Sequence, residues 1–255
     1  MTGPRPPDEY VVRFTDTPHG RVRSRILGPR REAPPVVAVM GMAVSDYLLP
    51  ALSTLSWSQV HLLDLPGLAG SGPPPQPLDV PGYAECVASW LDAADLPPVV
   101  LLGHSSGTQV AARTAVARPD RTAALVLASP TVDPKARSVP RALFWWRMDS
   151  HFPLPGLRET HIPEWRRAGF RQLVHLLLVH LRDRLEEVMP EVPCPVLVIR
   201  GEQDALSSDR WAAELATLAA DGRFVTTPGP HTFVWYDPHA WCGPIRELAT
   251  GRRVS

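Results

Sequence analysis

Residues 98–107 read Pro-Val-Val-Leu-Leu-Gly-His-Ser-Ser-Gly and join an apolar run to a helical pattern. The run 98–102 is short, apolar and uncharged, which predicts a strand buried on both faces. The alanine-rich segment 106–118 predicts a helix that is ended by Pro119. A strand, a Gly-x-Ser-x-Gly sequence and a helix in this order indicate a nucleophile elbow, the tight turn that exposes a serine hydroxyl.

Ser105 is the candidate nucleophile because it occupies the central position of this motif. Gly103 and Gly107 have a steric role, since a Cβ at either position would collide where the strand and the helix meet. The motif also arises by chance, so its meaning depends on whether the chain supplies a base and an acid.

Size and composition predict one soluble globular core. The 255 residues are 44% hydrophobic and 20% charged, and they leave room for an inserted subdomain. Basic and acidic residues balance at 26 each, so we expect no nucleic-acid partner. No signal-like start and no apolar run of 18 residues occur, which predicts no membrane partner and a cytoplasmic location. Three well-separated cysteines favour a reducing compartment and no metal site: Cys86, Cys194 and Cys242.

Apolar segments alternate with helical ones along most of the chain. Eight segments predict strands: 10–14, 21–27, 35–40, 60–65, 98–102, 123–128, 195–200 and 223–227. Five segments predict helices: 45–55, 83–94, 106–118, 208–220 (with Ser208 or Asp209 as its cap) and 241–249. This alternation predicts an α/β fold, with a mostly parallel sheet that is covered by helices on both faces.

One region interrupts the alternation. From about 132 to 192 there is no strand pattern, and apolar residues from Phe170 to Val188 recur at helical spacing. We interpret 133–190 as a helical cap inserted into a core domain formed by 1–132 and 191–255. The alternative is an ordinary helical layer of the main core.

The predicted strand ends point to a single site. In parallel sheets reactive groups gather at the carboxyl ends of the strands. Several candidate residues follow such ends: Gly41, Asp64, Ser105, Ser129 and Gly201.

A serine nucleophile needs a base and a group that orients this base. His231, in Pro-Gly-Pro-His-Thr after the last apolar strand, is the candidate base, although it could instead cap a surface loop. Asp204, in Gly-Glu-Gln-Asp after the strand 195–200, is the candidate acid. Glu202 and Asp133 are its rivals, and Asp64 is expected to shape its own turn.

An oxyanion formed during acyl transfer needs two backbone N–H donors. We expect one from Ser106, at the start of the helix after the nucleophile. The other is expected from Met42, in the loop Met-Gly-Met-Ala after the strand 35–40.

The chain resembles the α/β-hydrolase superfamily from about Tyr10 to Leu248. The resemblance rests on the chain order Ser, Asp, His of the three candidate residues and on the sequence around each of them. The resemblance implies an eight-stranded sheet, a cap between strands six and seven, and a triad of Ser105, Asp204 and His231. One departure is Met40-Gly41, where the family usually has His-Gly. That histidine normally braces the oxyanion loop.

These residues predict a cofactor-free serine hydrolase that acts through an acyl-enzyme. Its partner would be a small apolar ester, thioester or lactone, and we expect a monomer or homodimer. Serine in place of aspartate argues against alkyl-enzyme chemistry. A carbon–carbon hydrolase, lyase or cyclase with the same triad and a non-catalytic binding protein are the alternatives. Aromatic residues in 133–190 could line an apolar pocket or simply pack the cap.

Overall fold

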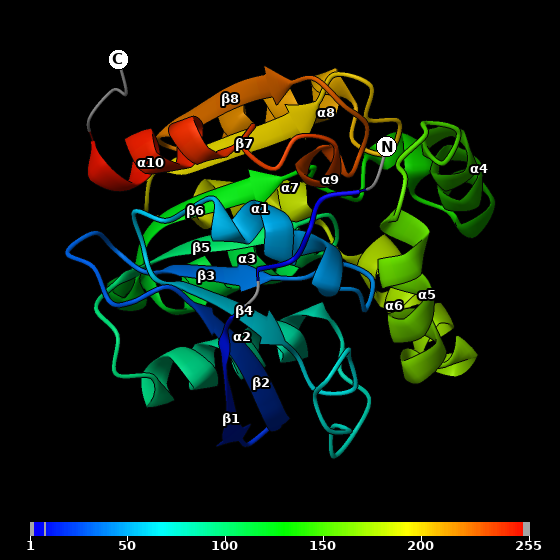
Figure 1. Ribbon diagram of the computed structural model, residues 1–255. Helices are drawn as coiled ribbons and strands as arrows, with labels where there is room; N and C mark the ends of the chain where they lie inside the picture. Colours follow the sequence, from blue (N-terminus) through cyan, green and yellow to red (C-terminus); the bar gives the residue numbers. More distant parts are fainter. Residues whose placement is uncertain (1–2, 8, 252–255) are drawn as a thin grey trace.

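The computed structural model describes residues 3–7 and 9–251. The predicted core domain also includes residues 1–2, 8 and 252–255, which lie outside the described residues. Eight strands form one sheet in the order β1-β2-β4-β3-β5-β6-β7-β8 (Figure 1). Their bounds are β1 Val11–Thr17, β2 Gly20–Leu27, β3 Val36–Val39, β4 Val60–Asp64, β5 Val99–His104, β6 Thr122–Ala128, β7 Val196–Gly201 and β8 Gly222–Thr227. All eight strands predicted from the sequence are present, which confirms the predicted fold class.

The sheet is parallel except at one edge. β1 pairs with β2, and β2 pairs with β4, in antiparallel directions. The other neighbouring strands, from β4 through β3, β5, β6 and β7 to β8, run parallel to one another. β3, β4, β5 and β7 are buried along their whole length, as expected for strands covered on both faces. β1 is mostly exposed at the edge.

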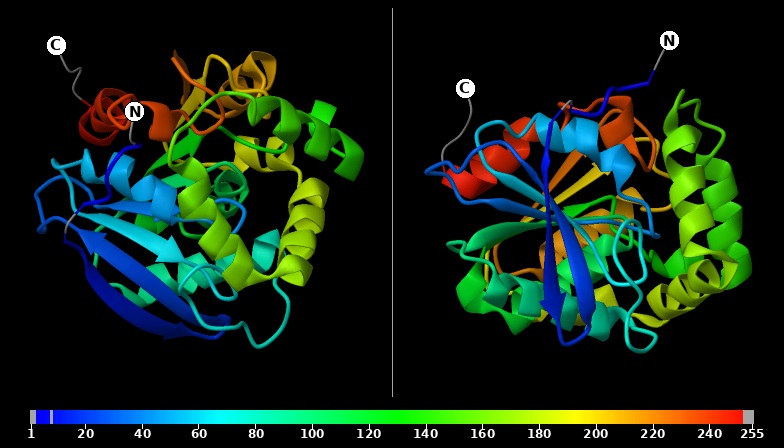
Figure 2. Two further views of the ribbon diagram at one scale, coloured as in Figure 1. Left: turned by 45° about the vertical axis from the view of Figure 1, so that its right-hand side comes forward. Right: turned by 60° about the horizontal axis from the view of Figure 1, so that its bottom comes forward.

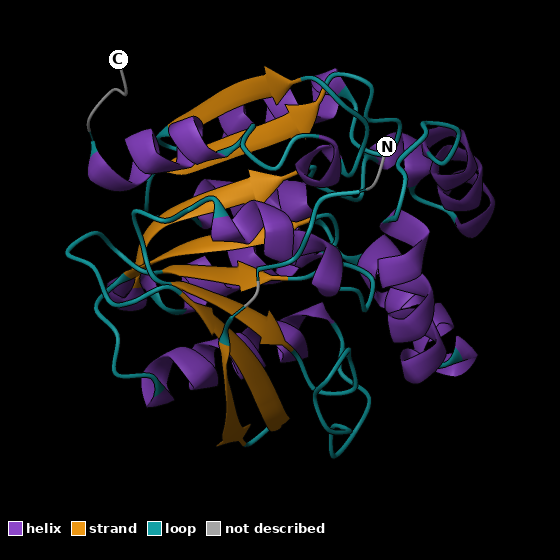
Figure 3. Cartoon of the chain, viewed as in Figure 1, coloured by secondary structure: helices purple, strands orange, loops and turns teal. Residues whose placement is uncertain are grey.

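Helices cover both faces of the sheet (Figure 3). α1 (Leu49–Ser53) and α10 (Cys242–Thr250) lie on one face, and α2 (Val80–Ala93), α3 (Gly107–Ala117) and α8 (Asp209–Leu218) on the other (Figure 1). Ser208 caps α8, since its side chain accepts a hydrogen bond from Trp211 N. The predicted helix 45–55 is divided into the 3-10 helix η1 (Asp46–Leu48) and α1. Short elements complete the core: η2 (Pro119–Arg121), η4 (Met189–Glu191) and α9 (Phe233–Tyr236).

Residues 133–190, which we call the cap segment, leave the sheet between β6 and β7. They form η3 (Pro134–Ala136), α4 (Val139–Asp149), α5 (Leu157–Ala168), α6 (Phe170–Arg182) and α7 (Leu185–Val188). The long helical pattern 170–188 is broken at Asp183, which has extended backbone and binds Arg113 of α3. In two views α4, α5 and α6 stand together beside the carboxyl ends of the central strands (Figure 2).

No helix of the described part of the chain is both long and apolar enough to cross a membrane.

Candidate active site

Ser105 lies at the tip of a tight turn between β5 and α3. Its φ is +56°, in the left-handed region that a non-glycine residue rarely adopts. The turn is close-packed, because a Cβ on Gly103 would lie 2.5 Å from Gly107 O and one on Gly107 would lie 2.5 Å from Val39 O. The two glycines therefore have the steric role that the sequence predicted, and strained backbone of this kind is characteristic of functional sites.

The structure brings Ser105, His231 and Asp204 into one hydrogen-bonded chain. His231 Nε2 lies 2.8 Å from Ser105 Oγ, and His231 Nδ1 lies 3.1 Å from each carboxylate oxygen of Asp204. The serine follows β5, the aspartate follows β7 and the histidine follows β8. The geometry is that of a nucleophile, a base and an orienting acid.

Two main-chain N–H groups hold the acid in place. Asp204 Oδ1 accepts hydrogen bonds from Leu206 N and Ser207 N, both at 2.8 Å, while both carboxylate oxygens face His231 Nδ1. Burial alone would raise the pKa of Asp204, but His231 and these hydrogen bonds hold that pKa below its ordinary value. The aspartate is therefore an anion at neutral pH.

The pKa of the base, His231, is shifted in the opposite direction. Burial alone would lower the pKa of His231, but the carboxylates of Asp204 and Asp149 hold that pKa above its ordinary value. The residue is only 6% exposed, so these charges act with little screening by water. A protonated His231 is thus stabilised, as a general base requires once it has accepted a proton.

A second histidine supports the base loop and does not face the nucleophile. His104 is buried, and its Nε2 lies 3.2 Å from His231 O while its Nδ1 lies 2.5 Å from Tyr47 Oη. Burial lowers its pKa to about 3, so the ring is neutral at physiological pH. Ser129 Oγ donates to the same His231 carbonyl at 2.8 Å.

The structure places the three alternative acids, Glu202, Asp133 and Asp64, in other surroundings. Glu202 is exposed, and Asp133 accepts hydrogen bonds from Lys135 N and Ser208 N. Asp64 is fully buried and pairs with Arg23 and Arg25. Of these acids, only Asp204 hydrogen-bonds to His231.

The loop after β3 lies directly against the nucleophile. A Cβ on Gly41 would be 2.8 Å from Ser105 Cβ and 3.2 Å from Ser106 N. Met42 and Ala43 both have positive φ, at +43° and +62°. Met42 N donates to Ser106 Oγ at 3.0 Å, so the two predicted oxyanion donors come from adjoining residues.

Substitution of Gly41 tests how closely the two loops must approach. We expect Gly41→Ala to lower kcat by about 10²-fold, because its methyl group would push the Met42 N–H away from the nucleophile. Steady-state kinetics with p-nitrophenyl butyrate would measure the effect. Gly243→Ala is the matched control, since no described atom outside its own stretch of α10 lies within 4 Å of its Cβ position. Equal kcat values for both folded variants would contradict this placement.

Two carboxylates of the cap segment approach the site, and no sequence motif identifies either of them. Asp149, at the end of α4, accepts hydrogen bonds from His231 N and Ala205 N. Glu164, in α5, accepts hydrogen bonds from Ser45 and Asp46, just beyond Met42. Both stand in helical segments without a recognisable motif, so only the three-dimensional arrangement identifies them.

Two other histidines of the cap segment have structural partners. His175 Nε2 lies 2.8 Å from Leu78 O, and His180 Nδ1 lies 2.6 Å from Gln109 Oε1.

The aromatic residues of the cap segment divide into two groups. Phe144, Trp146 and Phe170 are exposed, whereas Trp165 is half-buried and donates from Nε1 to Met42 O at 3.0 Å.

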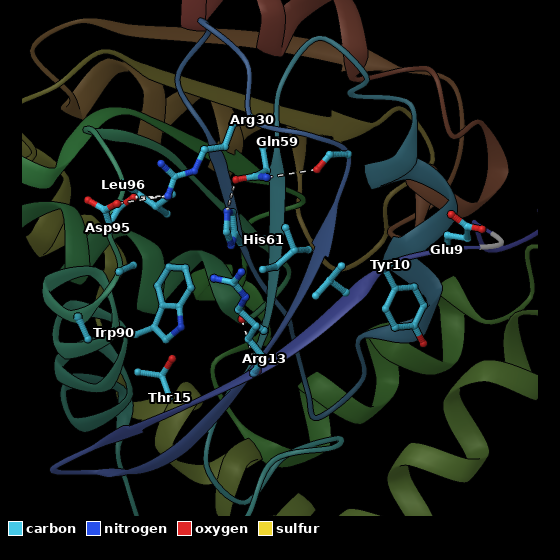
Figure 4. Close-up of a pocket in the computed structure, with 16 residues that line it drawn as sticks. Glu9, Tyr10, Arg13, Thr15, Arg30, Gln59, His61, Trp90, Asp95 and Leu96 are labelled. Atoms are coloured by element: carbon cyan, nitrogen blue, oxygen red, sulfur yellow. Dashed lines mark hydrogen bonds and ion pairs between the residues drawn. The ribbon is translucent and has the colours of Figure 1, made fainter.

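A groove of about 1000 Å³ lies far from these residues (Figure 4). Arg13, His61 and Trp90 line it from β1, β4 and α2, and Gln59 and Leu96 mark its position near the amino ends of β4 and β5. Ser105 is at the opposite, carboxyl end of β5, so this groove does not belong to the candidate site. Burial lowers the pKa of His61 to about 4, which leaves its ring neutral at physiological pH.

Comparisons with known proteins agree with this architecture. The chain is 27% identical over 181 residues to a poly(3-hydroxyalkanoate) depolymerase of Ectopseudomonas oleovorans, covering 68% of this chain and 62% of that protein. It is 29% identical over 140 residues to human monoglyceride lipase, covering 48% and 46% of the two chains. The chain thus spans less than two thirds of either relative.

Solved structures share the fold. A membrane phospholipase A superposes with a TM-score of 0.77 at 20% identity, covering 95% of this chain and 86% of that one. An E-2-(acetamidomethylene)succinate hydrolase gives a TM-score of 0.75 at 19% identity, covering 94% and 99%. The sequence model of the alpha/beta hydrolase family matches residues 39–242, which is most of the chain. The protein is therefore a member of the alpha/beta hydrolase family.

Proposed function

We propose that the protein is a serine hydrolase that cleaves an ester, thioester or lactone of a small apolar substrate through an acyl-enzyme. The observation that carries the proposal is the chain of hydrogen bonds from Ser105 Oγ through His231 to Asp204. Family membership supports a hydrolase, and the arrangement of the three side chains supports acyl transfer.

In the first half-reaction Ser105 Oγ attacks the carbonyl carbon while His231 Nε2 takes its proton. The carbonyl oxygen becomes an oxyanion that accepts hydrogen bonds from Met42 N and Ser106 N. The Met42 N–H now donates to Ser106 Oγ, so the oxyanion would replace that hydroxyl as its acceptor. His231 then returns the proton to the leaving group, and the acyl group remains on Ser105.

In the second half-reaction water takes the place of the leaving group. His231 removes a proton from the water, and the resulting hydroxide attacks the acyl carbonyl. Collapse of this intermediate returns the proton to Ser105 Oγ and releases the carboxylic acid. Asp204 remains ionised throughout and stabilises the imidazolium.

Pre-steady-state kinetics test the acyl-enzyme. With p-nitrophenyl butyrate, an activated ester, we expect a burst of p-nitrophenol that approaches one equivalent per enzyme, followed by slower deacylation. Samples quenched during the burst should carry a butyryl group. Linear release from time zero, with no acylated protein after the quench, would contradict the proposal and favour a proton-shuttle role for the triad.

The pH dependence follows from the direction of the His231 pKa. The base works in its neutral form, and neighbouring carboxylates raise its pKa above the ordinary value of about 6.5. Activity should therefore be low in acid and rise with pH through a midpoint above 6.5. A kcat/KM profile for p-nitrophenyl butyrate, corrected for background hydrolysis, measures this midpoint. A midpoint below 6.5 would contradict this account, because it would show that burial outweighs the stabilisation of the imidazolium by the carboxylates.

A further inference from the structure

The strained oxyanion loop is held from the cap segment. Glu164 Oε2 accepts hydrogen bonds from Ser45 N at 2.7 Å and Asp46 N at 3.1 Å, and its Oε1 accepts one from Ser45 Oγ at 2.9 Å. The Glu164 residue is 1% exposed. Trp165, the next residue of α5, donates to Met42 O. Two neighbouring residues of one cap helix thus bind the loop on both sides of Ala43.

The loop needs such support because of its backbone conformation. Met42 and Ala43 have positive φ in succession, a conformation that is unfavourable for residues other than glycine. Such a conformation persists only where its surroundings fix it. One local hydrogen bond, from Val44 N to Gly41 O at 3.1 Å, closes the loop on itself. The contacts from α5 add three main-chain hydrogen bonds: those of Ser45 N, Asp46 N and Met42 O.

Glu164 is connected to a buried arginine through the Ser45 hydroxyl. Arg25 of β2 donates to the same Ser45 hydroxyl and pairs with Asp46 at 2.5 Å and Asp64 at 2.9 Å. Burial and the charge of Asp46 raise the pKa of Glu164, whereas the Ser45 and Asp46 N–H groups oppose this shift. Because a buried carboxylate is costly unless it is paired and hydrogen-bonded, its contacts define the position of the loop closely.

A second cap carboxylate binds the loops of the base and the acid. Asp149 Oδ1 accepts hydrogen bonds from His231 N at 3.0 Å and from Ala205 N at 3.2 Å. Ala205 directly follows Asp204. One oxygen at the end of α4 therefore joins the two loops whose side chains form the His231–Asp204 pair.

We propose that Glu164 and Asp149 are positioning residues, through which the cap segment holds the oxyanion loop and the base and acid loops in their working geometry. The inference rests on the proposed serine-hydrolase function. Neither carboxylate acts on substrate, and each works through main-chain N–H groups of the catalytic loops. Any movement of α4 or α5 that admits substrate would also alter these contacts, so cap position and catalytic geometry are coupled.

Glu164 is tested by comparing two substitutions. Glu164→Ala removes all three hydrogen bonds to Ser45 and Asp46, and we expect kcat for p-nitrophenyl butyrate to fall about 10²-fold with KM changed less than about twofold. Glu164→Gln keeps an amide oxygen for the two main-chain donors, so it should recover most of the loss. Glu159→Gln, on the exposed surface of the same helix, is the control.

Asp149 is tested by kcat and by the midpoint of the pH profile. Asp149→Ala should lower kcat as Glu164→Ala does. Asp149→Asn keeps the acceptor and should retain kcat, but the pH midpoint should fall, because a nearby negative charge is lost. The charged and titratable groups that face His231 are Asp204 and Asp149, which raise its pKa, and the neutral His104. A merely structural Asp149 would leave the midpoint unchanged.

Thermal unfolding and near-ultraviolet circular dichroism establish which variants are folded. If an alanine variant is not folded, the asparagine and glutamine variants take its place in the test. Folded Glu164→Ala with wild-type kcat, or Asp149→Asn with an unshifted midpoint, would overturn the inference. Failure of the proposed function is a different result, namely wild-type turnover by Ser105→Ala.

Discussion

Replacing Ser105 with alanine is expected to lower kcat for p-nitrophenyl butyrate by about 10⁶-fold. The substitution removes the one hydroxyl that lies 2.8 Å from His231 Nε2. Binding of the ester should persist, because the proposed oxyanion donors Met42 N and Ser106 N remain. The measurement is steady-state turnover of purified protein at a pH above the His231 midpoint.

The loss in Ser105→Ala must come from chemistry and not from unfolding. Alanine tolerates the φ of +56° no worse than serine does, so the thermal midpoint should stay within a few degrees of wild type. Ser53→Ala is the matched control, since Ser53 is an exposed serine at the end of α1. Near-wild-type turnover by folded Ser105→Ala would refute Ser105 as the nucleophile.

Asp204→Asn is expected to lower kcat by about 10⁴-fold, the scale of the same change in a serine protease triad. The reason lies in the hydrogen bonds to Asp204 Oδ1. Leu206 N and Ser207 N would keep the amide oxygen of asparagine at that position, so its NH2 group would face His231 Nδ1. His231 would then carry its proton on Nε2 and could not accept one from Ser105.

Glu202→Gln is the control for Asp204→Asn, because Glu202 is an exposed acid in the same loop. It should retain wild-type turnover. The two variants should also unfold at similar temperatures if the asparagine takes the position of the aspartate. Loss of activity in Glu202→Gln, with Asp204→Asn active, would show that the wrong acid has been assigned.

The strands and the three side chains of the candidate triad could be predicted because each has a local signal. β5 and β7 each begin with four consecutive apolar residues, and Ser105, Asp204 and His231 each follow a strand end in a glycine-containing sequence. Parallel strands in one sheet bring their carboxyl ends together, so local patterns were enough to predict a common site.

Other features could not be predicted, because tertiary contacts decide them. The helical pattern 170–188 continues through Asp183, yet the helix stops there, where Arg113 of α3 binds that side chain. Glu164 and Asp149 lie in the cap segment among many charged residues. Nothing in their neighbours distinguishes them from Glu159, which is exposed.

The departure at Met40 acquires a physical explanation. The resemblance implies a histidine that braces the oxyanion loop, and this chain has Met40, a buried apolar residue. Here the loop is bound by Glu164 and Trp165 of α5 instead. The proposed oxyanion hole therefore depends on the cap segment, and substitutions in α5 should affect catalysis although α5 carries no member of the triad.

Mass spectrometry of the protein after reaction with a fluorophosphonate tests the central claim most directly. Such a reagent forms a stable phosphonyl ester with a serine that a base activates. We predict one adduct per chain, located on Ser105 in the peptide map, formed slowly or not at all in Asp204→Asn and absent in Ser105→Ala. Folded wild-type protein that stays unmodified, or that carries the adduct on another residue, would contradict the account.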